Sequence, residues 1–258
     1  HQNMVPYIVF VKFPPVKEIT DTFSSFCNVR VIWGGDMTVA ELRQSKIPAR
    51  TTEITFADRH SIAVIDADAY LEAERKDTII QNFYNDTYFS DQNACTAPRI
   101  IFWQGEKKEE AKADFWNRVH EKAVKEYSLA PVQAVGKLNA MYSVASQKKV
   151  KVEKSDDMFI TRLDVDRIDK DLMNYKYNSG FFFEKNIDNL MEIVDVCDVR
   201  CQTLTYYGVK EEDFREFLVE ARPIGIDRIV PMGKSMDFAL VWDGYDLIRQ
   251  MSRRVTII

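Results

Sequence analysis

Val29-Arg30-Val31-Ile32-Trp33-Gly34-Gly35-Asp36-Met37-Thr38-Val39 joins an apolar run to the start of a helix through two glycines. The run is rich in β-branched and aromatic residues, which favours a buried strand. Asp36 is the predicted N-cap of a helix through Val39, Leu42 and Arg43, because a carboxylate accepts hydrogen bonds from the free N–H groups of a first turn. The stretch therefore predicts a strand–turn–helix unit, the building block of an α/β fold.

The rest of the chain repeats this alternation. We expect strands at 7–11, 52–56, 61–65, 99–103, 158–163, 180–183, 202–207 and 255–258. We expect helices at 16–26, 67–84, 107–127, 135–146 and 211–221. The charged stretch 148–157 is expected to be a surface connection. Strands that alternate with helices imply parallel βαβ units, so the sequence predicts an α/β protein throughout.

Composition excludes several classes of protein. The 258 residues carry a net charge of -5, which argues against nucleic-acid binding, because phosphates need a basic surface. No apolar run approaches the roughly 20 residues that span a bilayer, so no integral membrane segment is expected. The first six residues lack the basic region and cleavage site of a secretory signal, which favours a cytoplasmic protein.

The chain has four cysteines: Cys27, Cys95, Cys197 and Cys201. Their spacings differ from those of a disulfide framework, which indicates a reducing compartment. Cys197 and Cys201 lie near Asp195 and Asp198, but the spacing is not CxxC and no second pair exists. No metal site is therefore predicted.

Cys95 stands in a polar, turn-forming segment, Tyr88-Phe89-Ser90-Asp91-Gln92-Asn93-Ala94-Cys95-Thr96-Ala97-Pro98-Arg99. A cysteine needed only for packing usually has apolar neighbours. A loop cysteine held against backbone N–H groups can instead be kept partly as thiolate, the form that attacks carbonyls. The residues themselves leave both interpretations open, a nucleophile and a quiet buried thiol.

A histidine base for Cys95 is not indicated. His1 is terminal, His120 lies on a charged predicted helix, and His60 lies in a tight turn between two predicted strands. Each position is more typical of a surface or structural residue. A cysteine–histidine protease is therefore not predicted.

Two further segments are candidates for cofactor binding. Gly34 and Gly35 let the backbone approach a ligand closely, and the helix N-terminus after them suits a phosphate of an adenosine cofactor. The simpler interpretation is an ordinary turn, since no GxGxxG fingerprint exists. Within Arg222–Gly233, Arg222 and Arg228 either reach cofactor phosphates or simply flank a strand-to-helix connection.

Several segments together resemble one family. Gln92-Asn93-Ala94-Cys95-Thr96-Ala97 is similar to the Gly-Gln-x-Cys nucleophile segment of the aldehyde dehydrogenase superfamily, with Asn-Ala where that motif has one residue. Nearly the whole chain resembles the LuxC-type fatty acyl-CoA reductases, a branch of that superfamily. The segments that carry this resemblance, in the same order, are Trp33–Asp36, Phe56–Ser61, Phe89–Arg99, Gln202–Gly208 and Gly225–Gly244.

This resemblance implies a fold and a reaction. The fold would be aldehyde-dehydrogenase-like, with part of a Rossmann-type cofactor domain at 1–82 and a thiol-bearing catalytic domain at 83–258. The reaction would be NADPH-dependent reduction of a long-chain acyl-CoA or acyl-protein to a fatty aldehyde, through a thioester on Cys95. The backbone N–H of Cys95 would help hold the oxyanion.

The resemblance also assigns residues to the cofactor. Trp33, Gly34, Gly35 and Asp36 lie where the cofactor loop meets its helix in the superfamily, and Arg228 is a further candidate contact. Family members are longer at the N-terminus. Their oxyanion asparagine and cofactor-gripping lysine lie upstream of this chain, and Lys12 is the candidate substitute for that lysine. An acyl-activating synthetase partner and a homo-oligomer are implied as well.

Two alternatives stay open. An aldehyde dehydrogenase that oxidises aldehydes to acids needs a carboxylate base. The matching position here is Thr55, or Glu53 if the alignment slips, and a missing base suits a reductase that must protect its acyl-enzyme from water. The other alternative is a catalytically incomplete subunit or fragment of a fatty acid reductase complex, which keeps only its interface.

Overall fold

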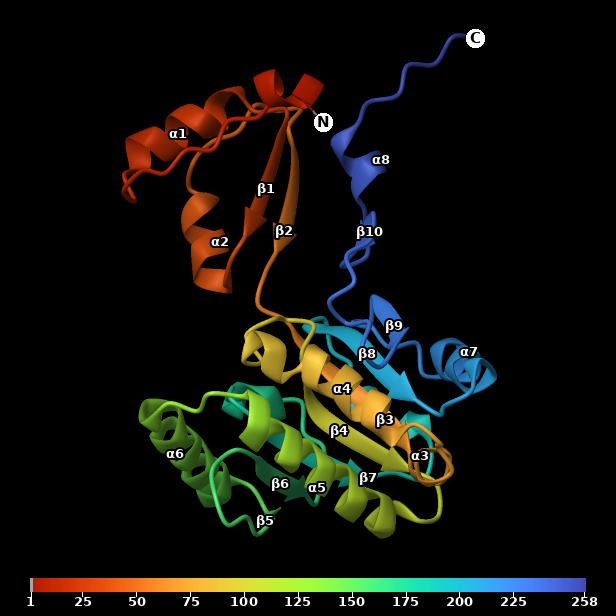
Figure 1. Ribbon diagram of the computed structural model, residues 1–258. Coiled ribbons are helices and arrows are strands. Elements are labelled where there is room, and N and C mark those ends of the chain that lie inside the picture. The colour runs from red at the N-terminus through yellow and green to blue at the C-terminus, as the bar shows by residue number, and fades with distance from the viewer. Residues whose placement is uncertain (1) are drawn as a thin grey trace. The chain divides into compact units, whose positions relative to one another are not determined.

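The computed structural model describes residues 2–258, so the expectation about His1 lies outside the described residues. Contacts divide the chain into two compact units: the chain up to Asp58 together with Tyr245–Ile258, and Arg59–Gly244 (Figure 1). The expected domain boundary at residue 82 lies inside a helix of the second unit. The assignment of cofactor binding to 1–82 and thiol chemistry to 83–258 stays a prediction.

The first unit contains a small parallel sheet. Its strands β1 (Val29–Trp33) and β2 (Thr52–Phe56) pair in parallel, and helix α2 (Asp36–Leu42) crosses between them. Val39 on α2 is buried, as are Ile32 and Ile54 on the strands. The remaining elements of this unit are η1 (Gln2–Tyr7), α1 (Lys17–Phe26), β11 (Tyr245–Asp246) and α8 (Leu247–Met251).

The predicted strand–turn–helix unit is confirmed, with one correction. Gly35, not Asp36, is the N-cap of α2, and no side chain caps the helix from that position. Asp36 is instead the first helical residue, and its carboxylate accepts a hydrogen bond from the N–H of Asp58 at 3.1 Å. The aspartate thus bonds to the turn that follows β2 rather than to its own helix.

The strands expected at 7–11 and 255–258 are wrong. Tyr7 ends the 3-10 helix η1, residues 8–11 have no regular structure, and Phe10 is 96% exposed. Residues 255–258 are likewise exposed and irregular. Both segments have β-prone sequences, but no strand within residues 2–258 pairs with either of them. A strand needs a partner for its backbone groups, and composition alone does not provide one.

The second unit is built on a seven-stranded sheet in the order β5-β6-β7-β4-β3-β8-β9. Neighbouring strands are parallel except β5 and β6, so the predicted parallel arrangement is confirmed. The strands are β3 (His60–Asp66), β4 (Pro98–Gln104), β5 (Val150–Val152), β6 (Thr161–Val165), β7 (Phe181–Asn186), β8 (Cys201–Tyr207) and β9 (Arg228–Pro231), and β10 (Val241–Trp242) lies outside this sheet.

Helices cover both faces of this sheet (Figure 1). Ile62 and Val64 of β3 face one hydrophobic core, and Ala63 and Ile65 face the other. The helices α3 (Ala67–Leu71), α4 (Lys76–Asp86) and α5 (Lys108–Glu126) pack on the second core. The other helical elements are α6 (Pro131–Gln147), α7 (Glu211–Glu220), η2 (Tyr88–Ser90), η3 (Leu172–Tyr175) and η4 (Leu190–Val196).

One predicted helix is broken. The helix expected at 67–84 divides into α3 and α4 between Leu71 and Lys76. The Tyr70 hydroxyl donates to Asp114 of α5 at 2.8 Å, and the Lys76 ammonium pairs with the same carboxylate at 3.2 Å. Six residues apart on one continuous helix, the two side chains would point in widely different directions. The break allows both to reach Asp114.

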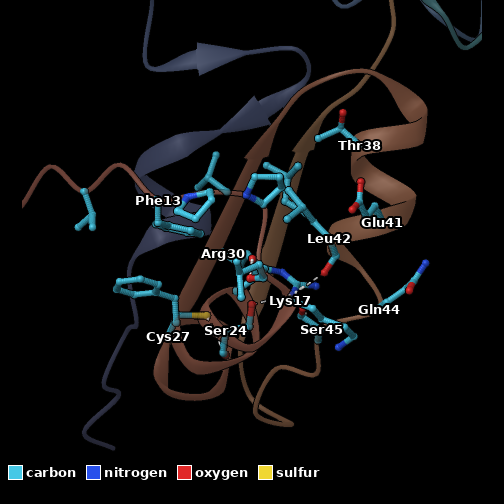
Figure 2. A pocket seen from close by; sticks show the side chains of 18 of the residues that line it. Phe13, Lys17, Ser24, Cys27, Arg30, Thr38, Glu41, Leu42, Gln44 and Ser45 are labelled. Atoms are coloured by element: carbon cyan, nitrogen blue, oxygen red, sulfur yellow. Dashed lines mark hydrogen bonds between the residues drawn. The ribbon is translucent and has the colours of Figure 1, made fainter.

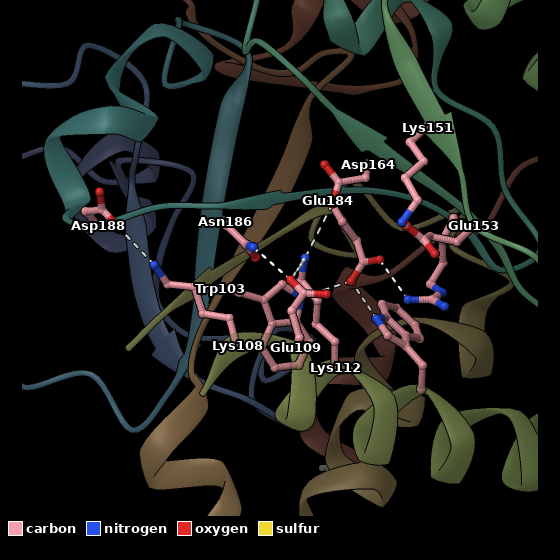
Figure 3. Close-up of polar contacts among 12 residues, drawn as sticks. Trp103, Lys108, Glu109, Lys112, Lys151, Glu153, Asp164, Glu184, Asn186 and Asp188 are labelled. Carbon is pink, nitrogen blue, oxygen red and sulfur yellow. Dashed lines mark hydrogen bonds and ion pairs between the residues drawn. The ribbon is translucent and has the colours of Figure 1, made fainter. Parts of the chain in front are cut away.

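A buried carboxylate joins the centre of the sheet to α5. Glu184 of β7 is 1% exposed and accepts hydrogen bonds from the indole N–H groups of Trp103 at 2.9 Å and Trp116 at 2.5 Å (Figure 3). Its second oxygen accepts from Arg162 at 3.0 Å. Burial raises the pKa of Glu184, and Arg162 opposes that effect. The contacts connect three neighbouring strands to one helix.

Candidate active site

The loop that carries Cys95 runs from η2 into β4 and makes a tight left-handed turn. Asp91 and Gln92 both have φ of 52°, which is uncommon for residues other than glycine. Because the loop precedes β4, it lies at the amino ends of the parallel strands. The starts of β3 and β8, the two strands that follow β4 in the sheet order, lie at the same edge.

Gln92 anchors this loop to β7. Its side chain is fully buried. The Oε1 atom accepts from the backbone N–H groups of Gly180 at 2.7 Å and Phe181 at 3.0 Å. The Nε2 atom donates to the carbonyls of Pro98 and Phe181, both at 3.3 Å. All hydrogen-bonding positions of the amide are used, so the loop backbone beside Cys95 is held in one conformation.

Arg99 makes a second anchor. Its guanidinium donates to the carbonyl of Gln92 at 2.5 Å, the carbonyl of Tyr177 at 2.7 Å and Oδ1 of Asn178 at 2.9 Å. Burial lowers the pKa of Arg99 to about 10, against the opposing effect of Cys95. Arg99 therefore remains a cation at neutral pH and closes the loop on its other side.

Ser61 connects Cys95 to two strands. Its hydroxyl, at the start of β3, donates to the Cys95 carbonyl at 2.7 Å and accepts from the N–H of Thr203 in β8 at 3.2 Å. The neighbouring Thr96 hydroxyl contacts Sδ of Met236 at 3.2 Å. Cys95 itself is partly buried and has no disulfide. The backbone of the predicted nucleophile is thus fixed from both sides.

The electrostatic surroundings keep the resting thiol protonated. Burial raises the pKa of Cys95, and the negative charge of Asp243 acts in the same direction. A hydrogen bond from Gln202 and the charge of Arg59 lower the pKa without cancelling the rise. Cys95 is therefore a neutral thiol at neutral pH, and its conversion to the thiolate needs a change in its surroundings.

Asp243 is the acidic residue whose charge acts on Cys95. Its side chain is almost buried, and the Gln202 amide donates a hydrogen bond to its Oδ1. Burial raises the pKa of Asp243 to about 6, with Asp227 acting in the same direction and Arg59 and Arg228 opposing. The carboxyl consequently titrates close to neutral pH.

The arginines of the site are engaged in structural contacts. Arg59 pairs with Asp227 at 2.6 Å and donates to the Cys201 carbonyl at 3.0 Å. Arg228 packs over the ring of Trp242 at 4.2 Å and donates to the carbonyls of Ser235 at 2.9 Å and Asp237 at 3.0 Å. Burial lowers the pKa of Arg228. The cofactor role of Arg228 stays a prediction.

Asp86, at the end of α4, holds the segment that contacts Thr96. Its buried carboxylate accepts from the N–H of Gly233 at 2.6 Å and from the N–H and hydroxyl of Ser235 at 3.1 and 2.7 Å. Met236, which touches Thr96, is the next residue. Burial raises the pKa of Asp86, and these three donors oppose the rise.

The glycine turn of the first unit is closed by its own neighbours. The N–H of Gly34 donates to the Phe56 carbonyl at 3.1 Å, and the N–H of Asp36 donates to Asp58 Oδ2 at 3.2 Å. A Cβ on Gly35 would lie 3.0 Å from the same Asp58 oxygen. Trp33 packs against Phe56 at 4.6 Å while staying 62% exposed. The cofactor role of this turn stays a prediction.

Beside this turn the first unit has a large open groove of about 810 Å³ (Figure 2). It is lined by Val9, Val11 and residues 13–16, and by residues of α1, β1 and α2. Arg30 lies in it and donates to Glu53 at 2.8 Å and to the carbonyls of Leu42 at 3.2 Å and Ser45 at 2.7 Å. Lys12, the candidate cofactor lysine, lies in the exposed irregular segment of this unit.

Glu53 and the described histidines have partners other than Cys95. Glu53 also pairs with Arg43 at 2.7 Å. Burial alone would raise the pKa of Glu53, but the hydrogen bonds from Arg43 and Arg30 outweigh it and leave the pKa lowered. This makes Glu53 a weak base. His60 contacts the Val196 carbonyl at 3.1 Å, and His120 pairs with Asp157 at 2.6 Å.

Residues 2–258 offer neither a metal-binding cluster nor a membrane-spanning helix. No group of three or more histidine, cysteine, aspartate or glutamate side chains there is arranged to hold a metal ion. In the same range, no helix combines the length and apolar character needed to cross a membrane.

Sequence reasoning missed Ser61, Gln202 and Asp243 as neighbours of Cys95. Ser61 and Gln202 lie at the starts of strands that flank or follow β4 in the sheet. The available signal was the parallel sheet itself, since parallel strands place their starts at one edge. Asp243 gave no comparable signal, because it belongs to the turn between β10 and β11, outside the seven-stranded sheet.

Comparison with known protein families finds a match over almost the whole chain. The profile of the family described as "Acyl-CoA reductase (LuxC)" matches residues 2–254. No curated protein sequence matches the chain significantly.

Solved structures show the fold. Aldehyde dehydrogenase 21 from Physcomitrella patens is similar with a TM-score of 0.57 and 12% identity, over 84% of this chain and 47% of that one. Lactaldehyde dehydrogenase from Escherichia coli gives a TM-score of 0.53 and 12% identity, over 83% and 47%. The chain thus has an aldehyde-dehydrogenase-like fold and spans about half the length of these two enzymes.

Proposed function

Because the chain belongs to the acyl-CoA reductase (LuxC) family, we propose that it serves the NADPH-dependent reduction of long-chain acyl-CoA to fatty aldehyde, with Cys95 as the nucleophile. The observation that carries this proposal is the position of Cys95. The thiol lies on a loop that Gln92 and Arg99 hold in one conformation, and Ser61 holds its carbonyl. A fixed, partly buried cysteine beside hydrogen-bond donors suits covalent catalysis.

The proposed reaction has two stages. The Cys95 sulfur attacks the thioester carbonyl of the substrate, the carbon–sulfur bond to CoA breaks, and the CoA thiolate leaves and takes up the proton that Cys95 gave up. When bound, NADPH supplies the hydride that reduces the acyl carbon. The resulting hemithioacetal then releases the aldehyde as the bond to Cys95 breaks, and the Cys95 thiolate takes up a proton. The backbone N–H of Cys95 stabilises the oxyanion in both stages.

We propose that Trp33, Gly34, Gly35 and Asp36 contact the cofactor. The exposed indole of Trp33 offers an aromatic face, and Gly34 and Gly35 keep the turn beside it tight. The N–H of Asp36 is already bonded to the Asp58 carboxylate, which would repel a phosphate. The turn therefore suits ribose hydroxyl groups, which can donate hydrogen bonds to such a carboxylate.

The substrate, the partner and the location are proposed from membership in the same family. We propose a long-chain acyl-CoA or acyl-protein as substrate, an acyl-activating synthetase as partner, a homo-oligomer and a cytoplasmic location. A catalytically incomplete subunit of a fatty acid reductase complex remains the competing proposal. Titration with NADPH, followed by protein fluorescence, separates the two: saturable binding supports the enzyme, and its absence supports the incomplete subunit.

The nucleophile is tested by mass spectrometry. The protein is incubated with a long-chain acyl-CoA without NADPH, and the expected result is one acyl adduct on Cys95. Cys27→Ala is the matched control, because Cys27 is also a partly buried free cysteine and its loss should leave the adduct unchanged. The same adduct in Cys95→Ala, or no adduct in the unsubstituted protein, would contradict the proposed chemistry.

A further inference from the structure

Asp243 is a nearly buried carboxyl that the proposed reaction leaves without a role. It is 6% exposed and has φ of 49°, and Gly244 after it has φ of 76°. Side chains other than glycine seldom adopt this conformation, although aspartate is among those that do. A Cβ on Gly244 would lie 2.8 Å from Asp227 Oδ1. The left-handed turn therefore holds the Asp243 carboxyl inside the unit.

Gln202 bonds to this carboxyl, and a hydrogen bond from Gln202 also lowers the pKa of the Cys95 thiol. It is fully buried at the start of β8, and its Nε2 donates to Asp243 Oδ1. The next residue, Thr203, donates its backbone N–H to the Ser61 hydroxyl, and that hydroxyl donates to the Cys95 carbonyl. The side chain of Ser61 therefore connects the start of β8, which carries Gln202, to Cys95 through two hydrogen bonds.

The second atom of the Gln202 amide is unsatisfied. Its Oε1 is buried and has no hydrogen-bond partner among residues 2–258. An acceptor buried in this way is costly unless a donor is available in another state of the site. A protonated Asp243 is such a donor: half a rotation of the Gln202 amide presents Oε1 to the new O–H group.

The charged groups around Asp243 are Arg59, Asp227, Arg228 and the Cys95 thiol. Asp227 already forms an ion pair with Arg59. Arg228 packs over Trp242 and donates to backbone carbonyls. Two acids in such a small, largely buried space do not readily ionise together, because each negative charge disfavours the other.

We propose that Asp243 is a positioning residue that controls, together with Gln202, when the Cys95 thiol ionises. In one state the Asp243 carboxylate disfavours a negative charge on sulfur and keeps the thiol protonated. In the other state Asp243 has taken up a proton from solvent, and the thiol loses its proton to solvent more readily. Gln202 donates to the carboxylate in the first state and accepts from the carboxylic acid in the second. This inference rests on the proposed function of Cys95.

The test is the pH dependence of Cys95 alkylation by iodoacetamide, in a Cys27→Ala background whose other cysteines, Cys197 and Cys201, are buried. In Asp243→Asn the midpoint of alkylation should fall by about one pH unit or more, because a negative charge has been removed. Asp237→Asn is the control, since Asp237 is an exposed carboxylate of the preceding segment and pairs with Lys234 at 2.9 Å. Its midpoint should stay unchanged.

A midpoint in Asp243→Asn equal to that of the background protein overturns the proposal. So does faster alkylation by one constant factor at every pH, which indicates only an opened loop. If Asp243→Asn does not fold, the background protein decides alone: two coupled steps in its profile support the proposal, and a single ionisation overturns it. Alkylation needs neither acyl-CoA nor NADPH, so a failure of the proposed reduction leaves this result readable.

Discussion

The side-chain amide of Gln92 pairs with the backbone of Phe181 in both directions: Oε1 accepts from the peptide N–H at 3.0 Å, and Nε2 donates to the carbonyl at 3.3 Å. Two residues of adjacent antiparallel strands exchange hydrogen bonds in the same manner. Here a loop side chain takes the place of one strand, at the start of β7. The Cys95 loop is thereby attached to the central sheet although its own backbone adopts no strand conformation.

Replacement of Gln92 by alanine should lower the free energy of unfolding by about 3 kcal/mol, because buried backbone groups at Gly180 and Phe181 lose their partner. Urea denaturation measures this change. Gln81→Ala is the matched control, since Gln81 is exposed and its amide donates only to Asn85, and it should change stability by less than about 0.5 kcal/mol. Equal stabilities of the two variants would contradict the anchoring role of Gln92.

Glu184→Leu should destabilise the second unit by about 3–5 kcal/mol, because the buried carboxylate is the partner of Trp103, Trp116 and Arg162. Glu184→Gln keeps an acceptor for the indole groups and should cost less. Denaturation monitored by tryptophan fluorescence reports both stability and the surroundings of the two indoles. A leucine variant as stable as the glutamine variant would mean that these hydrogen bonds do not stabilise the sheet.

Because Lys137 is buried, we expect the protein to become more stable as pH rises above neutral. Its ammonium group is buried and donates to the carbonyls of Ser179 at 2.7 Å and Phe159 at 3.4 Å, and also to Met158. Burial lowers the pKa of Lys137 to about 8, against the opposing charges of Asp157 and Asp91. Between pH 8 and about 10 the unfolded chain keeps a proton that the folded chain has lost.

The contribution of Lys137 to folding therefore increases across that interval, by up to about 3 kcal/mol. This contribution is fully present above the pKa that Lys137 has in the unfolded chain, and it is lost as pH falls through the pKa that Lys137 has in the folded chain. Comparison of urea midpoints at pH 7 and pH 9 in the unsubstituted protein, Lys137→Met and the control Lys125→Met checks this. The rise should be absent from Lys137→Met alone. A rise of equal size in all three proteins would assign it to other groups.

Glu53 separates thioester reduction from aldehyde oxidation. In Glu53→Gln the ion pairs with Arg30 and Arg43 are weakened, so stability should fall by about 1–2 kcal/mol. Acylation of Cys95 should persist, because the proposed reduction uses no carboxylate base. Arg43→Gln disturbs the same ion pair and serves as the control. If aldehyde oxidation is present and is lost in Glu53→Gln but kept in Arg43→Gln, the aldehyde dehydrogenase alternative is favoured.

The predicted strands were confirmed where burial follows directly from a short apolar run, as in Ser61–Ile65 and Arg99–Trp103. The run at Tyr7–Val11 is also apolar and rich in β-branched residues, yet it forms no strand, because pairing depends on what lies beside a segment in space. The broken helix at 67–84 has a similar cause. Its break allows Tyr70 and Lys76 to share Asp114, which lies on another helix.

The thiol site was predictable only in part. The polar surroundings of Cys95 indicated a special loop, and the structure shows how Gln92 and Arg99 hold that loop. The partners on other elements were not visible. Ser61 and Thr203 are 142 residues apart along the chain and bond because β3 and β8 are neighbouring strands. The strand order of a sheet is a property of the folded chain, which local sequence patterns do not encode.

The bond between Asp86 and Ser235 spans 149 residues and has a consequence for synthesis. While the ribosome has not yet added Ser235, a nascent chain has no donor from that residue for the Asp86 carboxylate. Interior packing around α4 then carries an uncompensated charge, which delays closure of the unit. A chain that ends before Gly233 lacks all three donors to Asp86, so its closed form would bury an unpaired carboxylate and should open more readily than that of the finished chain.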